Sequence, residues 1–187
     1  VMLRGKQSWV FTNKPYIVST GTVVGPFEAN GKIADDFDIL HEDLWLQEDS
    51  YEKAHRKFLE EASDIAIKKG EIQKDNVQFL LAGDLINQMT PTNFAAEKMS
   101  IPYLGVFGAC STSMEGLALA SFLVNYGGAN YVLTGASSHN AAVEKQFRYP
   151  TEYGGQKPPT AQWTVTGAGV ALVSNVGVGP RVTSATI

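Results

Sequence analysis

The chain has 187 residues, 44% hydrophobic and 18% charged, which is enough for one globular domain with a sizeable core. The formal net charge is −4 and the basic residues form no stripe, so a nucleic-acid partner is not expected. No run approaches the ~20 apolar residues that cross a bilayer. A single cysteine excludes an intrachain disulfide and fits a reducing compartment.

The first predicted element is a strand over residues 15–24 (PYIVSTGTVV). It is rich in β-branched side chains and ends at a Gly-Pro breaker. The segment 28–50 that follows is polar and irregular. We predict that it forms a lid or a partner contact, with Leu44 and Trp45 as its apolar anchors.

Residues 49–69 form the clearest predicted helix. Asp49 followed by Glu52 indicates a capping box, and Gly70 suits the position after the last turn. His55 lies among charged neighbours and is predicted to be on the surface. The apolar face of this helix is Ala54, Phe58, Ala62, Ile65 and Ala66.

Short strands and helices alternate along the rest of the chain. Residues 77–82 (VQFLLA) are continuously apolar, which is typical of a strand buried on both faces. The alternation predicts an α/β fold with a mostly parallel sheet flanked by helices. Residues 149–159 are predicted to form a loop within the same domain. The remaining predicted elements are a helix over 92–99, a strand over 103–107, a helix over 109–126, and strands over 130–136 and 164–174.

The sequence FGACSTSMEG, residues 107–116, is the feature that favours chemistry. A buried strand ends, small residues make a turn, and a helix begins close to Cys110. Ligands bind beyond the carboxyl ends of strands in open α/β sheets, and free N–H groups at a helix start favour a thiolate. Cys110 is therefore a candidate nucleophile. A small buried hydrophobe and one wall of an anion site, shared with Ser111 and its neighbouring hydroxyls, are the alternatives.

A thiol nucleophile normally needs a base, and the chain has three histidines. His139 follows the predicted strand 130–136 and two serines, Ser137 and Ser138. If the strands are parallel, it lies at the same edge of the sheet as Cys110. The sequence contains no CxxC, HExxH, P-loop or GxGxxG motif, so no metal and no cofactor is expected.

Four strings, in the same order, resemble the thiolase superfamily. PYIVSTGTVVGP is similar to its first strand, LLAGDLINQ to its second buried strand and the loop after it, and GACSTSMEG to its nucleophile turn. VTGAGVALVS is similar to the strand that closes the first half of that fold. The resemblance implies a thiolase-like domain over residues 1–187, the N-terminal half of an α-β-α-β-α layered fold. It also implies that the C-terminal half, with the catalytic histidines of condensing enzymes, is absent from this chain.

Longer strings resemble one family within it, the stage V sporulation protein AD family of endospore formers. They are LRGKQSWVF, FGACSTSME and SSHNAAVEKQFRYPTEYGGQKP. The resemblance implies a non-enzymatic sporulation protein that binds dipicolinic acid, also as its calcium chelate, for uptake into the forespore. It further implies contact with the other stage V sporulation A membrane proteins, a peripheral place on the cytoplasmic face of the spore inner membrane, and a homodimer.

Dipicolinate is a planar pyridine with two carboxylates, so its site needs donors or cations at both ends of a flat slot. The alternative is a ketoacyl-synthase-type or thiolase-type acyltransferase with Cys110 as its nucleophile, and a scaffold without a pocket is a third possibility. Tyr149, Tyr153 and Lys157 could add rings and a cation to the dipicolinate site. Its predicted ligand-binding residues are Cys110, Ser111, Ser137, Ser138, His139 and Arg148.

Overall fold

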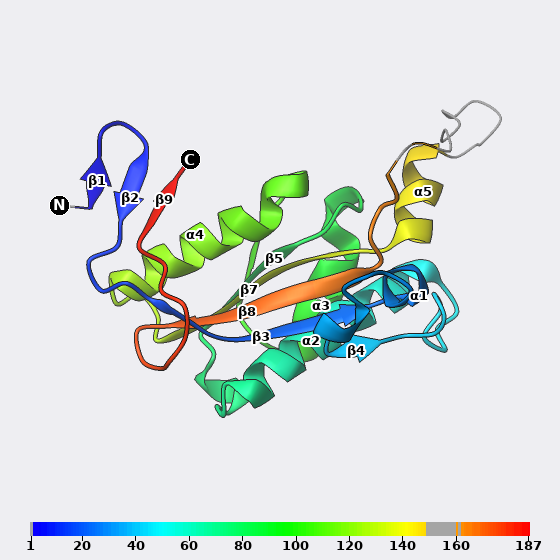
Figure 1. Cartoon of the computed structure of the whole chain (residues 1–187), viewed down its shortest axis with the longest axis horizontal. Coiled ribbons are helices and arrows are strands. Elements are labelled where there is room, and N and C mark those ends of the chain that lie inside the picture. Colours follow the sequence, from blue (N-terminus) through cyan, green and yellow to red (C-terminus); the bar gives the residue numbers. More distant parts are fainter. Residues whose placement is uncertain (1, 149–159, 161) are drawn as a thin grey trace.

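A mixed six-stranded sheet forms the centre of the computed structural model, which describes residues 2–148, 160 and 162–187 (Figure 1). Its strand order is β4-β3-β8-β7-β5-β6. Those strands are β3 (Tyr16–Val24), β4 (Ile39–Leu40), β5 (Phe79–Gly83), β6 (Tyr103–Gly105), β7 (Tyr131–Ser138) and β8 (Gly167–Ser174). The helices are α1 (Pro26–Ala29), α2 (Tyr51–Lys69), α3 (Thr90–Met99), α4 (Thr112–Asn125) and α5 (Asn140–Arg148).

The pairing of these strands confirms the predicted α/β class. Parallel pairs are β3–β4, β5–β6 and β5–β7, whereas β8 runs antiparallel to both β3 and β7. The sheet is therefore mixed, with parallel pairs at both edges and the antiparallel β8 between them, and Cys110 follows β6 at one edge.

Helices cover the two faces of the sheet unequally. Figure 1 shows α2 and α3 on one face and α4 on the other. The core under α2 and α3 includes Phe58, Leu80, Leu133 and Leu172, all fully buried. The core under α4 is a separate cluster of Leu81, Val106, Ala120, Val124, Ala129, Val132 and Val173.

Two glycines allow the helices to approach the sheet closely. A Cβ on Gly21 of β3 would lie 2.0 Å from the carbonyl oxygen of Ala62 in α2. A Cβ on Gly116 of α4 would lie 2.4 Å from Oγ1 of Thr134 in β7. Both separations are shorter than van der Waals contact, so only glycine fits without moving a helix away from its strand.

The boundaries of α2 correct the predicted cap. Ser50 is the N-cap, and its Oγ accepts the backbone N–H of Lys53 at 3.2 Å. Asp49 instead pairs with the Lys53 ammonium at the exposed surface, so the predicted Asp49–Glu52 capping box was wrong. Gly70 ends the helix as predicted but with an ordinary φ of −75°. Glycine fits there because a Cβ would lie 2.5 Å from Leu172 Cδ2.

Several elements were not predicted from the sequence. A three-stranded sheet joins β1 (Leu3–Arg4), β2 (Ser8–Val10) and β9 (Ser184–Thr186), with Ser8 paired to Thr186. The short β4 and the helices α1 and α5 were also missed. Strands of two or three residues carry too little periodicity to be recognised, and β2 pairs with a segment from the other end of the chain.

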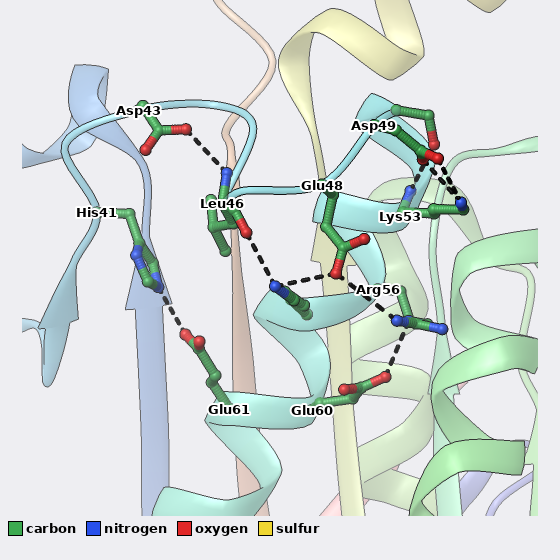
Figure 2. Close-up of polar contacts among 11 residues, drawn as sticks. His41, Asp43, Leu46, Glu48, Asp49, Lys53, Arg56, Glu60 and Glu61 are labelled. Carbon is green, nitrogen blue, oxygen red and sulfur yellow. Dashed lines mark hydrogen bonds and ion pairs between the residues drawn. The ribbon is translucent and has the colours of Figure 1, made fainter.

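The segment predicted as a lid is fastened to α2 over residues 41–50 (Figure 2). Lys57 Nζ donates to the Leu46 carbonyl oxygen at 2.9 Å and contacts Glu48 Oε1 at 2.9 Å. His41 Nε2 lies 2.6 Å from Glu61 Oε2. Leu46 is the buried apolar anchor, rather than Leu44 or the exposed Trp45. This loop, residues 41–50, therefore holds a fixed position against α2.

Membrane spanning was tested on the helices of the described residues. None of these helices combines the length and the apolar character needed to cross a bilayer.

We predict that Ser50→Ala lowers the free energy of unfolding by about 1 kcal/mol, because the first turn of α2 loses its cap. Asp49→Ala is the matched control and should cost less, since its ion pair is exposed. Urea denaturation of both variants measures the difference. If Asp49→Ala lowers the free energy of unfolding more than Ser50→Ala does, Asp49 rather than Ser50 caps the helix.

Candidate functional site

Cys110 lies in a 3₁₀ turn, Ala109–Ser111, directly before α4. The predicted helix start at residue 109 was too early, because Ala109 has a φ of +49° and cannot continue an α-helix. A left-handed residue other than glycine costs about 1 kcal/mol or more, a strain typical of functional turns. The Cys110 side chain is exposed as a result, which overturns the alternative of a small buried hydrophobe.

Hydrogen bonds inside the turn fix its shape. The Gly108 N–H donates to Thr112 Oγ1 at 3.0 Å, and Ser111 Oγ donates to the Gly108 carbonyl oxygen at 2.7 Å. Among the described residues, no side chain caps α4, while the Thr112 N–H donates to the Ala109 carbonyl oxygen of the preceding turn. The positive end of the helix dipole favours an anionic group near this end of α4.

A cavity of about 750 Å³ lies beside Cys110, within the usual size range of ligand sites, about 300–1,000 Å³. Its polar lining includes Cys110, Ser113 and Ser138, and its apolar lining includes Ile33 and Phe37. The other lining residues are Thr22, Val24, Glu28, Gly31, Leu85, Ala109, Ala136, Ser137, Thr164, Val165, Gly167, Ala168 and Gly169. We call this space the Cys110 cavity.

Ser137 and Ser138 both border the Cys110 cavity, but their side chains point to opposite faces of β7. Successive side chains of a strand alternate. Ser137 has the parity of Leu133, which packs under α2, and its Oγ lies 2.9 Å from His55 Nε2 on that helix. Ser138 has the parity of Val132, which packs under α4. Ser138 is therefore the serine whose side chain shares a face with Cys110.

His55 is fully buried, so its predicted place on the surface was wrong. Burial, with a smaller contribution from the nearby His139, lowers the pKa of His55 to about 3. The ring is thus neutral and forms part of the core between α2 and the end of β7. A wider helical stripe indicates its burial, because His55, Leu59, Ser63 and Ile67 repeat every four residues and are all buried.

His139 is also fully buried and lies outside the lining of the Cys110 cavity. Its Nε2 is 2.8 Å from the carbonyl oxygen of Leu44, an acceptor, so Nε2 carries the hydrogen. Its Nδ1 accepts the backbone N–H of Ala142 at 3.3 Å. Both ring nitrogens are engaged, and burial lowers the pKa of the ring. In this arrangement His139 offers no free nitrogen to a ligand or to Cys110.

Two predicted ligand-binding residues remain, Ser111 and Arg148. Ser111 borders a different cavity, between α4 and the three-stranded sheet, together with Trp9 and Met114. Arg148 is the last residue of α5, and its side chain lies outside what the structure describes. Tyr149, Tyr153 and Lys157 also lie outside the described residues.

Glu28 of α1 is the one charged residue among the described residues that line the Cys110 cavity. Its Oε1 accepts the backbone N–H of Thr166 at 3.1 Å, and its Oε2 is buried without a hydrogen-bond partner among the described residues. Nothing in the sequence singled out Glu28 as a site residue. In the described part of the chain, no three His, Cys, Asp or Glu side chains are grouped closely enough to hold a metal ion.

Comparisons with known proteins agree with this geometry. A model of the stage V sporulation protein AD family matches residues 5–187. The chain belongs to the stage V sporulation protein AD family. It is 47% identical over 185 residues to the stage V sporulation protein AD of Bacillus subtilis (strain 168). That match covers 99% of this chain and 55% of the relative, so the chain spans about half the length of the relative.

Solved structures with the same fold are condensing enzymes of the thiolase-like class. The 3-oxoacyl-[acyl-carrier-protein] synthase III of Aquifex aeolicus VF5 aligns with a TM-score of 0.58 at 15% identity, over 86% of this chain and 53% of that chain. A single-residue variant of Xanthomonas campestris OleA aligns with a TM-score of 0.57 at 12% identity, over 88% of this chain and 58% of that chain. These identities show the thiolase-like fold alone.

We predict that the buried histidines make the protein acid-sensitive. The unfolded chain binds a proton at His55 below about pH 6.5, whereas folded His55 stays neutral down to about pH 3. Stability from this group is therefore complete above pH 6.5 and is lost as the pH falls, by up to about 1.4 kcal/mol per pH unit. Chemical denaturation between pH 4 and pH 7 measures the slope.

The matched variant for this measurement is His55→Gln, which keeps a donor near the position of Nε2 but does not titrate. Its unfolding free energy should depend less steeply on pH than that of the wild type. Identical slopes in the two proteins would contradict a neutral, buried His55.

Proposed function

We propose that this chain carries the dipicolinate-binding site of a non-enzymatic sporulation protein, and that the Cys110 cavity is that site. The observation that supports the proposal most is the composition of its lining. Its polar groups include the thiol of Cys110 and the hydroxyls of Ser113 and Ser138, and its apolar residues include Ile33, Phe37 and Leu85. Such a mixed lining is suited to a planar ligand that carries polar groups at its ends.

One carboxylate of the ligand is proposed to lie at the start of α4. There it would lie near the positive end of the helix dipole and accept a hydrogen bond from the Ser113 hydroxyl. Ser138 carries an Oγ that is buried without a partner among the described residues, and a ligand oxygen would satisfy it. Ile33, Phe37 and Leu85 would pack on the faces of the pyridine ring.

The charge of the cavity favours the calcium chelate over the free dianion. Two carboxylates entering beside Glu28 would meet like charge and lose their hydration without a cation in the described lining. Calcium bound by the pyridine nitrogen and both carboxylates makes the ligand neutral. Arg148 is the second proposed source of positive charge, and the experiment below separates the two.

The partners and location that the family resemblance implies complete the proposal. They are the other stage V sporulation A membrane proteins, a peripheral place at the forespore inner membrane, and a second copy of the chain. The edge strand β6 supports the second copy, because Leu104 and the nearby Phe107 are exposed apolar side chains at an unpaired edge.

Calorimetric titration of the full-length protein tests the ligand. We expect dipicolinate with calcium to bind, dipicolinate with a calcium chelator to bind more weakly, and Cys110→Ala to weaken binding by removing one wall of the cavity. Benzene-1,3-dicarboxylate is the matched control ligand, since it keeps both carboxylates but lacks the ring nitrogen that completes the chelate.

If neither dipicolinate alone nor dipicolinate with calcium produces binding heat, the proposed function is wrong. If binding is independent of calcium but is lost in Arg148→Ala, the free dianion is the ligand and Arg148 supplies the positive charge. Equal affinity for the benzene dicarboxylate would exclude recognition of the chelate.

A second candidate function is acyl transfer by Cys110. It is favoured by the exposed thiol at the head of α4 and by the fold shared with the synthases. In that reaction the Cys110 thiol would lose its proton to solvent, and the thiolate would attack the carbonyl carbon of an acyl thioester. The bond between that carbon and the coenzyme sulfur would break, and the coenzyme thiolate would take up a proton from solvent.

Incubation with an acyl-coenzyme A followed by intact-mass analysis separates the two functions. The binding proposal predicts an unmodified mass. An acyl adduct that disappears in Cys110→Ala would favour the enzyme.

A further inference from the structure

His139 directly follows a residue that lines the Cys110 cavity but does not line the cavity itself. Ser138, the residue before it, lines the cavity, and Asn140, the residue after it, begins α5. The Asn140 N–H donates to Thr166 Oγ1 at 2.9 Å, and the Thr166 N–H donates to Glu28 Oε1. These hydrogen bonds connect the backbone around His139 to α1 and to Thr166. Thr164 and Val165, just before Thr166, also line the cavity.

The ring of His139 joins this backbone to loop 41–50. Nε2–H donates to the Leu44 carbonyl oxygen at 2.8 Å, and Nδ1 accepts the Ala142 N–H at 3.3 Å and so caps the first turn of α5. The neutral tautomer with hydrogen on Nε2 is the one form that satisfies both partners. Tyr51 packs on the ring, with centroids 5.1 Å apart.

The far end of this connection is rigid. Lys57 holds the carbonyl of Leu46, two residues after Leu44, and Figure 2 shows Glu48, Arg56 and Glu60 continuing the polar network along α2. Leu46 itself is buried. The carbonyl of Leu44 is therefore held in place, and its hydrogen bond to the His139 ring restrains the end of β7.

We propose that His139 is a positioning residue, whose ring fixes the Ser138 hydroxyl in the Cys110 cavity by bridging loop 41–50 and the first turn of α5. The assignment rests on the proposed function, because it takes the Cys110 cavity as the ligand site. It replaces direct ligand binding by His139 with an indirect role through Ser138.

Two conservative variants separate the two hydrogen bonds of the ring. His139→Asn keeps an oxygen near Nδ1 that can cap the Ala142 N–H but is too short to reach Leu44. His139→Gln keeps a donor near Nε2 for Leu44 but leaves Ala142 uncapped. Ser8→Ala is the control, since Ser8 bonds Thr186 in the three-stranded sheet, outside the cavity lining and loop 41–50.

A double-mutant cycle on the affinity for calcium dipicolinate, measured by calorimetry on the full-length protein, tests the assignment. Ser138→Ala and His139→Ala should each weaken binding about tenfold, the value of one hydrogen bond. The double variant should be no more than about twofold weaker than Ser138→Ala, because His139 acts through Ser138. His139→Asn and His139→Gln should each lose less than His139→Ala, and Ser8→Ala should bind as the wild type.

Additive losses, about a hundredfold in the double variant, would show that His139 reaches the ligand by another route and would overturn the assignment. An unchanged affinity in His139→Ala would do the same. If His139→Ala does not fold, His139→Asn replaces it in the cycle, and ¹⁵N spectra of the wild-type histidine must show hydrogen on Nε2. If the wild type binds neither form of dipicolinate, the proposed function fails and this assignment fails with it.

Discussion

Side chains along β7 alternate between the two faces of the six-stranded sheet, and the composition of the candidate site depends on that alternation. It sends Ser137 toward His55 under α2 and Ser138 toward Cys110 under α4. Two adjacent serines of the same chemistry therefore have different roles: one satisfies a core histidine, and the other is a donor for the cavity. A shift of one residue in the pairing with β8 would exchange them.

Much of the fold follows from the sequence, because its buried strands are short apolar runs separated by turn residues. The strands over Tyr16–Val24 and Phe79–Gly83 and the helix over Tyr51–Lys69 were predicted within a few residues. The three-stranded sheet was missed, since β2 and β9 pair across almost the whole length of the chain. The sequence also predicted the turn at Cys110, because a run of small residues between a strand and a helix is typical of a tight turn.

The site was harder to predict than the fold, because orientation decides it. Cys110, Ser137, Ser138 and His139 all lie at or just beyond the carboxyl ends of strands, and position alone makes all of them candidates. The structure separates them by which atoms are already engaged. His139 has used both ring nitrogens within the protein, and Ser137 has used its hydroxyl. Glu28 enters the lining from a four-residue helix with no motif to mark it.

The central claim, that the Cys110 cavity holds dipicolinate, is tested most directly by a crystal structure of the full-length protein grown with calcium dipicolinate. We predict ligand density against the first turn of α4, with a carboxylate oxygen within hydrogen-bond distance of Ser138 Oγ and no contact to His139. Ligand density in the cavity between α4 and the three-stranded sheet, beside Ser111 and Trp9, would contradict this account.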